Sequence, residues 1–256
     1  MKQLIAFTKK EFLEQKRSGR IIILTLLFCL FGIMNPAIAK LTPWMMDLLS
    51  EELAKSGMSV TKVNVDALTS WTQFFKNGPI VLIVFLVMFG GILTNECQKG
   101  TLINVITKGL NRYRIIVSKT FTMFILWTVG YLLCYGITYG YNAYFWDNSI
   151  ANNLLFAAFG LYLFGLWLIT LIPLASTIFS SSSAVLLSLG GAYLTTYLLS
   201  LLPTLTELSP TRLTDSANLL TGTSKISDYG MAIIISILFM VFNIVVSIQL
   251  FNKKNI

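Results

Sequence analysis

Six long apolar runs, separated by polar stretches, dominate the pattern of the chain. They cover 21–39, 79–95, 113–139, 154–178, 184–202 and 230–251. A helix needs about 20 apolar residues to cross a bilayer, and each run is close to or above that length. The pattern therefore predicts an all-α integral membrane protein with six transmembrane helices, forming a single domain over 1–256.

Composition supports the same class, because 55% of the residues are hydrophobic and only 12% are charged. A soluble domain usually carries about 25% charged residues. One alternative concerns the first run, in which Ala37-Ile38-Ala39 fits a small-x-small cleavage site of a signal peptide. We favour a span, because a long amphipathic segment precedes the run and the run exceeds a typical signal core.

The segment before the first run, 1–20, is amphipathic. Leu4, Ile5, Thr8 and Phe12 fall on one helical stripe, and lysines follow its flank. Such a helix lies in the headgroup plane with its apolar side towards the lipid, and anionic lipid attracts it. We therefore predict an N-terminal interfacial helix, an elbow leading into the first span.

Two polar stretches lie between spans on the opposite side from this helix. In 40–77, Thr42-Pro43 predicts a helix start, Gly57 predicts a stop, and a second short helix is expected over about 66–76. The later stretch, 203–228, carries two prolines and is expected to hold short helices near the outer leaflet.

Charge predicts the orientation. With both termini in the cytoplasm, thirteen of the 19 lysines and arginines lie on the cytoplasmic side, and eight of the 11 acids lie outside. This asymmetry satisfies the positive-inside rule. It also explains the net charge of +8 without a nucleic-acid partner.

The residues that most enzymes require are missing from the sequence. There is no histidine, the three cysteines lack metal-ligand spacing, and no phosphate-binding G-x-x-x-x-G-K-[ST] loop occurs. We therefore expect no catalytic residue, metal site or cofactor in this chain, which is not an enzyme. The central portions of the spans carry no charged residue, which counts against an ion-coupled secondary transporter.

A basic stretch, 94–119, interrupts the second and third spans. Glu96 is its only acid, and its apolar residues Leu102, Ile103 and Ile106 recur at helical spacing before Gly109, a favoured helix-ending residue. We predict a short amphipathic helix over about 98–108, roughly 15 Å long, that docks into a soluble partner. Further on, Arg114 and Lys119 are expected to reach up to headgroups. The alternative is an ordinary basic cytosolic loop.

The fifth span carries small residues at every fourth position. They include Ser188, Ala192, Thr196 and Ser200. In lipid, such a stripe lets another helix approach closely. It fits a contact with a second copy of the chain, the wall of a translocation path, or packing within one bundle.

The layout of elbow helix, six spans and an acidic-then-basic loop resembles the permease subunit of a type-2 (ABC-2) bacterial ABC transporter. The run from Glu96 to Leu102, followed by Arg112 and Lys119, is similar to the coupling-helix region of that family. Within the family, the chain looks most like permeases that export small amphipathic peptides, such as phenol-soluble modulins or bacteriocins.

The resemblance implies a multi-pass permease in the bacterial cytoplasmic membrane, working as a homodimer with two separate ATP-binding subunits that hold ATP and Mg²⁺. It implies a coupling helix over 96–109, an outer lid over 203–228, and a path lined by the second and fifth spans. The implied ATPase-coupling residues are Glu96, Lys99, Gly100, Thr101, Leu102, Ile103, Ile106 and Arg112. The rival hypotheses are an ion-coupled secondary transporter and a non-transporting scaffold or immunity protein.

Overall fold

The computed structural model describes residues 2–55 and 65–254, and across these ranges the chain forms helices and no strands. Six helices are long and apolar enough to cross a membrane, as the sequence predicts. They are α2 (Arg20–Lys55), α3 (Ala67–Phe89), α6 (Arg112–Phe145), α7 (Leu154–Ile178), α8 (Ser182–Ser200) and α10 (Gly230–Lys253). The protein is thus an all-α, multi-pass membrane protein.

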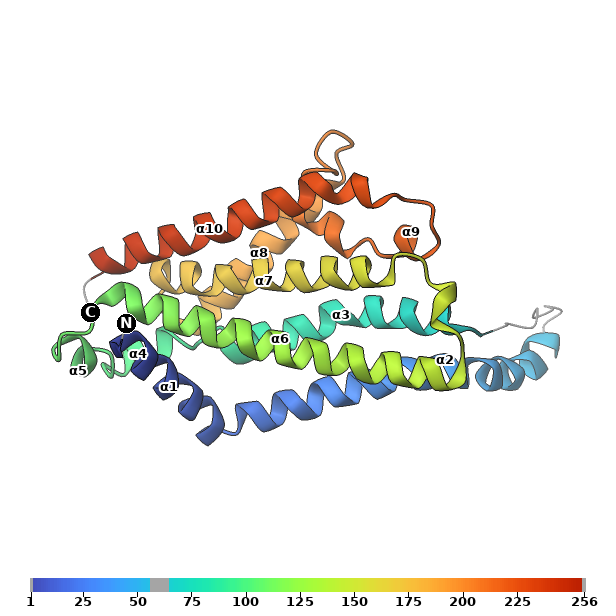
Figure 1. Ribbon diagram of the computed structural model, residues 1–256, viewed down its shortest axis with the longest axis horizontal. Coiled ribbons are helices and arrows are strands. Elements are labelled where there is room, and N and C mark those ends of the chain that lie inside the picture. The colour runs from blue at the N-terminus through green and yellow to red at the C-terminus, as the bar shows by residue number, and fades with distance from the viewer. Residues whose placement is uncertain (1, 56–64, 255–256) are drawn as a thin grey trace.

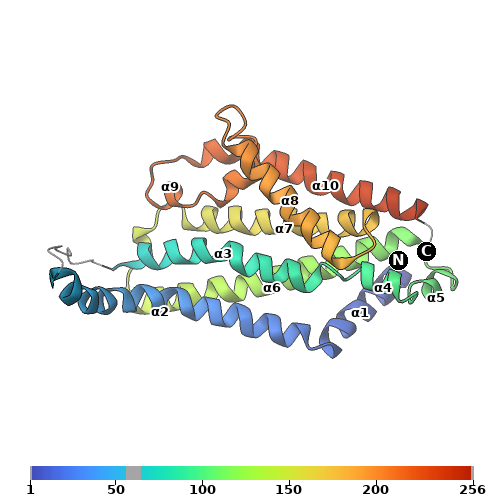
Figure 2. The same ribbon diagram turned by 180° about the vertical axis from the view of Figure 1, so that it is seen from behind.

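The long helices lie roughly side by side in an elongated bundle, and both termini are at the same end (Figure 1). We call this the basal end. It also carries three shorter helices, α1 (Lys2–Arg17), α4 (Thr94–Gln98) and α5 (Ile103–Ile106), as the reverse view confirms (Figure 2). The opposite, distal end carries η1 (Asn148–Ile150), η2 (Pro210–Thr214), α9 (Ala217–Leu220) and η3 (Ile226–Tyr229).

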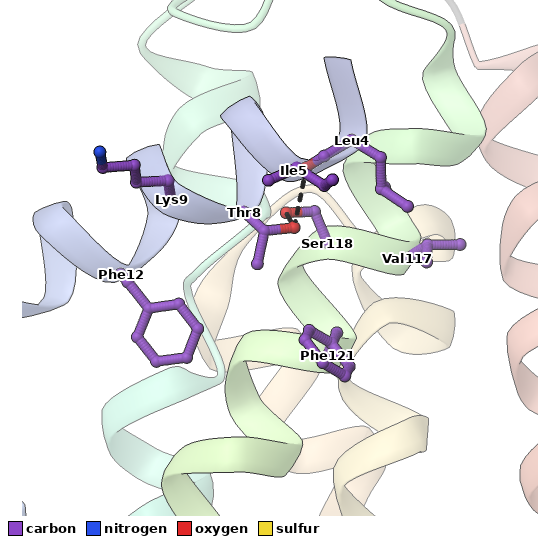
Figure 3. Close-up of a pocket in the computed structure, with 8 residues that line it drawn as sticks. All are labelled: Leu4, Ile5, Thr8, Lys9, Phe12, Val117, Ser118 and Phe121. Carbon is purple, nitrogen blue, oxygen red and sulfur yellow. Dashed lines mark hydrogen bonds between the residues drawn. The ribbon is translucent and has the colours of Figure 1, made fainter. Parts of the chain in front are cut away.

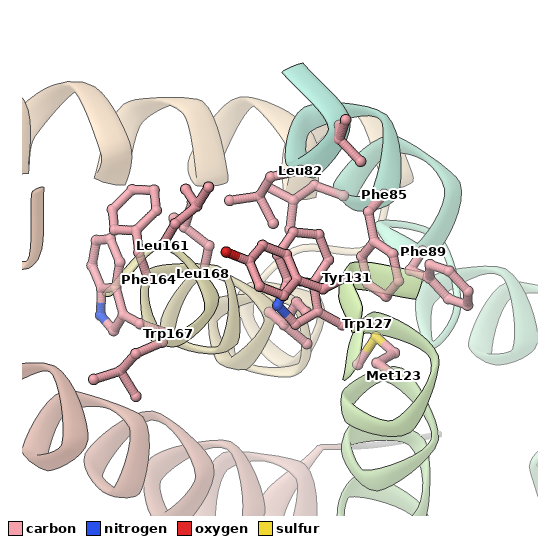
Figure 4. Packing of buried hydrophobic residues seen from close by; sticks show 14 of the residues in the cluster. Leu82, Phe85, Phe89, Met123, Trp127, Tyr131, Leu161, Phe164, Trp167 and Leu168 are labelled. Carbon is pink, nitrogen blue, oxygen red and sulfur yellow. The ribbon is translucent and has the colours of Figure 1, made fainter. Parts of the chain in front are cut away.

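Aromatic side chains of α2, α3, α6 and α7 pack with aliphatic ones in the core of the bundle. Figure 4 shows those of α3, α6 and α7. Trp127 of α6 lies at its centre, with its ring centroid 5.8 Å from that of Phe28 on α2 and 5.5 Å from that of Phe85 on α3. Two glycines make this close packing possible. A Cβ at Gly130 would lie 2.2 Å from the Phe28 ring, and one at Gly165 would lie 2.4 Å from Trp127.

The expected helix start at Thr42-Pro43 is wrong, because α2 continues through Pro36 and Pro43 to Lys55. The predicted short helix over 66–76 begins where expected, with the Asp66 carboxylate accepting a bond of 2.9 Å from the Thr69 amide. It does not end there, since α3 runs through Pro79 to Phe89. Gly57, the expected stop, lies outside the described residues.

Prolines do not end these helices because a broken helix is costly in lipid and neighbouring groups take up the freed carbonyls. Pro36 has no amide hydrogen, so the Gly32 carbonyl lacks its helical donor. The hydroxyl of Thr138 on α6 donates to that carbonyl at 3.0 Å. A hydrogen bond between α6 and α2 thus replaces the bond that is missing within α2.

The ends of the other helices lie closer to the predicted positions. Helix α7 covers the predicted fourth span, and α6 begins near the expected residue but continues to Phe145. Over 203–228 the chain forms the expected short helices, and η2 packs against α7, α8 and α10. Helix α8 lies at the edge of the bundle, where only Val185 and Leu189 of its residues are buried.

Candidate functional site

A buried lysine anchors a group of charges at the basal end. Lys119 lies two turns into α6 and its side chain is only 2% exposed. Its ammonium is 2.8 Å from a carboxylate oxygen of Glu11 on α1 and 2.8 Å from one of Glu96 on α4. The prediction that Lys119 reaches up to headgroups is therefore wrong, because two carboxylates hold it inside the protein.

A second lysine joins the group from α1. The Lys10 ammonium lies 3.1 Å from Glu11, 2.7 Å from Glu14 and 2.9 Å from Glu96. Three carboxylates and two ammonium groups thus connect α1, α4 and α6. We call these five residues, Lys10, Glu11, Glu14, Glu96 and Lys119, the basal ion network.

The helical period of α1 explains how a charged residue comes to be buried. Phe7, Glu11 and Gln15 recur every fourth residue, so they share one face, and all three are buried. That face packs against α6, where Lys119 provides the opposite charge. Burial of an unpaired carboxylate would be prohibitive, so the ion pair is a condition for this packing.

The carboxylates of the network stabilise the charge of Lys10. Burial opposes the charge of Lys10, but its bond to Glu14 and the other carboxylates outweigh burial and raise the pKa of the ammonium well above its ordinary value. A polar cavity of about 380 Å³ adjoins the network, and Arg20 and Lys99 add positive charge to its wall. The excess negative charge of the three carboxylates is therefore balanced locally.

The arrangement of these acids raises the question of a metal site. Oxygen atoms of Glu11, Glu14 and Glu96 lie within 4.8 Å of one another. However, the ammonium groups of Lys10 and Lys119 contact all three carboxylates at 2.7–3.1 Å. The lysines supply the positive charge that a metal would bring, so the geometry is that of an ion-pair network.

The basal hairpin, which we define as 94–111, differs from the predicted single helix over 98–108. It contains two separate short helices, α4 and α5, with a turn between them. Gly100 in that turn has φ +67°, a left-handed conformation that ends a helix. The predicted left-handed residue at the far end is confirmed, since Gly109 has φ +87°.

The predicted coupling residues divide into two groups. Leu102 is only 1% exposed and Ile106 is packed against the core, so neither forms an outward docking face as expected. Arg112 donates to the Phe251 and Asn252 carbonyls at the end of α10, at 3.3 and 3.2 Å.

The other coupling residues form the surface of the hairpin, apart from Glu96 in the ion network. Lys99, Thr101 and Ile103 are exposed, and Gly100 forms the turn between them. The prediction that Arg114 reaches headgroups is wrong, because its guanidinium donates to Gln3 of α1. The basal hairpin therefore has an exposed tip and a base that Glu96 holds to α1 and α6.

An apolar cavity of about 280 Å³ lies between α3, α7 and α8. Its walls include Leu82 and Leu86 of α3, Phe164 of α7, and Leu189 and Tyr193 of α8. We call this the interspan cavity. It brings together the second and fifth spans, the two that the family resemblance assigns to a path.

The stripe of small residues on α8 does not line this cavity. Ser188, Ala192, Thr196 and Ser200 are half-buried on an adjacent face of the helix. At its distal half this face contacts the same chain, because Ser209 donates to the Thr196 carbonyl at 3.1 Å and Thr206 donates to the Ser200 carbonyl at 2.8 Å. Both bonds go to backbone carbonyls of α8, so the role of the small side chains stays a prediction.

Comparison with known proteins finds a relative that aligns over almost its whole length and that is itself uncharacterized. No family model matches the chain. The chain is 24% identical, over 266 aligned positions, to the uncharacterized transmembrane protein YxlG of Bacillus subtilis (strain 168). The alignment covers 99% of this chain and 98% of that protein, so the similarity extends over all six spans.

Sequence reasoning singled out Glu96, as an implied coupling residue, and did not predict the ion network for any of its five members. The amphipathic pattern of 1–20 does not distinguish Lys10, Glu11 and Glu14 from other charges of a surface helix, and Lys119 is predicted near headgroups. One signal was present: Glu11 shares the helical face of the apolar Phe7. A carboxylate on an apolar face requires a partner, but the sequence does not show that the partner is Lys119.

Proposed function

We propose that the chain is the membrane-spanning permease subunit of an ATP-driven ABC exporter of the type-2 (ABC-2) kind. In this proposal it lies in the bacterial cytoplasmic membrane with its basal end in the cytoplasm. It pairs with a second permease copy and with two copies of a separate ATP-binding subunit. The arrangement of the elbow helix, the six spans and the basal hairpin between the second and third spans supports this proposal.

The observation that carries the proposal is the connection between the hairpin tip and the spans. Ile103 at the tip is 44% exposed, which leaves an apolar contact for a soluble partner. At the base, Glu96 is held by Lys119 of α6 and Lys10 of α1. A force on the tip therefore reaches α3 through the chain, and α1 and α6 through charged contacts.

This connection suggests a mechanism. Closure of the ATP-binding subunits pushes on the basal hairpin, and the ion network makes α1 and α6 move with it as one body. Helix α3 moves relative to α8, and the interspan cavity between them changes shape. ATP and Mg²⁺ act on the partner subunits, and this chain contributes the path.

The interspan cavity indicates the class of cargo. Its lining is apolar, with leucines from three helices and the rings of Phe164 and Tyr193. Such a surface accepts an aliphatic group or the apolar face of an amphipathic helix, and it provides no charge to hold an ion. A small amphipathic peptide, such as an antimicrobial or toxin peptide, is the cargo that we favour.

The test uses a matched pair of isoleucines. The chain is co-expressed with a candidate phosphate-loop ATPase from a neighbouring gene, purified in mild detergent and assayed for co-elution and for peptide-stimulated ATP hydrolysis. Ile103→Asp places a charge at the hairpin tip. Ile150→Asp places the same charge at the distal end, where Ile150 is 49% exposed.

We expect the wild type and Ile150→Asp to co-elute with the ATPase in equal molar amounts. We expect Ile103→Asp to lose at least tenfold in ATPase binding while remaining monodisperse. Equal behaviour of the two variants would contradict the docking role of the hairpin. Failure of the wild type to bind any candidate ATPase would overturn the proposal.

One observation favours an ion-coupled carrier as a second candidate. Lys119, Glu11 and Glu96 are buried ionisable groups of the kind that proton-coupled carriers use. They lie at the basal end and not in the central portions of the spans, which is why we rank this candidate second. Peptide transport by the chain alone in proteoliposomes, driven by a pH gradient without any ATPase, would support it over the exporter.

A further inference from the structure

A groove of about 510 Å³ lies between α1 and α6 at the basal end (Figure 3). Leu4, Ile5 and Phe12 line it from α1, and Val117 and Phe121 line it from α6. Ile5 is 67% exposed and Phe121 is 53% exposed, so large apolar groups face outward here. Neither the ion network nor the proposed path uses this groove.

The polar groups in the groove have their hydrogen bonds within the protein. The Thr8 hydroxyl donates to the Leu4 carbonyl at 2.9 Å and lies 2.9 Å from the Ser118 hydroxyl. Because the Thr8 hydrogen is already used, Ser118 is the donor in the second bond. Both hydroxyl hydrogens are therefore occupied, and the groove offers an apolar surface to its occupant.

Positive charge lines one edge of the groove. Lys2, Lys9 and Lys16 recur every seventh residue, so they share one side of α1, and all three are exposed. Across residues 2–55 and 65–254, no carboxylate lies within ion-pair distance of any of them. Lys9 borders the groove itself, and its ammonium points away from the rings of Phe12 and Phe121 (Figure 3).

We propose that this groove binds one anionic phospholipid, with an acyl chain between Phe12 and Phe121 and the phosphate at the Lys9 ammonium. The charge pattern supports this occupant, since the groove is apolar inside and cationic at its edge. Its α6 wall belongs to a helix that crosses the membrane, so lipid is the molecule that meets it. The proposal holds whether or not the chain is a transporter subunit.

Binding at this place has a structural consequence. The lipid contacts α1 and α6 together, next to the face on which Glu11 meets Lys119. It therefore helps to hold α1 against α6 and shields the basal ion network from the bilayer side.

The test measures lipid retention by native mass spectrometry. Delipidated full-length protein in detergent is titrated separately with phosphatidylglycerol and phosphatidylcholine of the same acyl chains. We expect one molecule of phosphatidylglycerol to be retained in preference to phosphatidylcholine. We expect Lys9→Gln to reduce that preference about fivefold, which corresponds to about 1 kcal/mol for one lysine near an anionic headgroup. Lys108→Gln, at an exposed lysine of the basal hairpin, is the matched control and should leave the preference unchanged.

A second pair of variants tests the acyl-chain contact. Ile5→Trp fills the groove from an exposed position, and Leu13→Trp adds the same bulk to an exposed position of α1 that does not line it. We expect Ile5→Trp to abolish preferential retention and Leu13→Trp to preserve it. Equal retention of the two lipids by the wild type, a Lys9→Gln preference equal to that of Lys108→Gln, or unchanged retention by Ile5→Trp would each overturn the proposal.

Discussion

The Thr138 hydroxyl lies 3.0 Å from the Gly32 carbonyl and donates to it. That carbonyl is the one that Pro36, four residues further along α2, cannot satisfy. Thr138 is fully buried, so no solvent is available to replace the bond. Thr138 of α6 therefore supplies the donor that the proline removes from α2.

A double-mutant cycle tests this dependence. Thr138→Val keeps the shape of the side chain but leaves a buried carbonyl without a donor, which should cost about 1–3 kcal/mol in unfolding free energy. Pro36→Ala restores the helical amide to Gly32, so in that background Thr138→Val should cost less than about 0.5 kcal/mol. Unfolding by denaturant in mixed micelles measures both. The same penalty in both backgrounds would contradict the assignment.

The basal ion network predicts a large effect at Lys119. Lys119→Met removes the buried ammonium that contacts both Glu11 and Glu96 and leaves Lys10 as the ammonium of the network that contacts them. Removal of one member of a buried pair typically costs about 3–5 kcal/mol. The matched control is Lys108→Met, which removes an exposed lysine and should change stability by less than about 0.5 kcal/mol. Thermal unfolding in detergent compares the two.

A second substitution, Glu11→Gln, should restore part of the stability that Lys119→Met loses. Adding Glu11→Gln to Lys119→Met removes one uncompensated charge, so the double variant should be more stable than Lys119→Met alone. If the double variant loses the sum of the unfolding free energies that the two single variants lose, the two residues act independently of each other.

The basal hairpin predicts opposite outcomes for neighbouring residues. Leu102 is 1% exposed, so Leu102→Ala should lower the unfolding free energy by about 2–5 kcal/mol. Ile103→Ala, at an exposed position, should stay within about 0.5 kcal/mol of the wild type. Thermal unfolding of the two variants is the measurement. If Ile103→Ala were the more damaging change, the hairpin would have to present its other face to the core.

Two glycines of α6 form a further matched pair. A Cβ at Gly130 would lie 2.2 Å from the buried ring of Phe28, which packs on Trp127 and has little room to move. Gly130→Ala should therefore cost about 1–3 kcal/mol through overpacking. A Cβ at Gly136 meets no atom within 4 Å, so Gly136→Ala should be neutral or slightly stabilising. Equal melting temperatures for the two variants would contradict the close packing of α2 on α6.

The spans could be predicted from the sequence because their apolar length is set by the bilayer. Helix α7 matches the prediction, and α10 begins at the predicted residue. The prediction failed where it applied the turn chemistry of water to membrane helices. Thr42-Pro43 and Pro79 look like boundaries in a soluble protein, but both lie inside continuous helices here.

Most of the basal ion network could not be predicted from the sequence, because its members come from different helices. Whether Lys119 is buried depends on Glu11 and Glu96, which come from other helices. Glu11 shares a helical face with Phe7, which indicates that it needs a partner, but no fixed spacing links it to Lys119 or Glu96. The break at Gly100 is likewise decided by how the hairpin packs, since a glycine is also tolerated within a helix.

Glu11 and Lys119 are 108 residues apart, and this separation constrains the order in which the protein assembles. When the ribosome has made α1, α2 and α3, Glu11 has Lys10 beside it, but its buried partner Lys119 has not yet been synthesised. Full burial of the Glu11 carboxylate requires Lys119, because dehydration of the carboxylate without this ion pair is too costly. Helix α1 therefore stays at the membrane surface until α6 has been inserted. The segment made first is then among the last to take its final place.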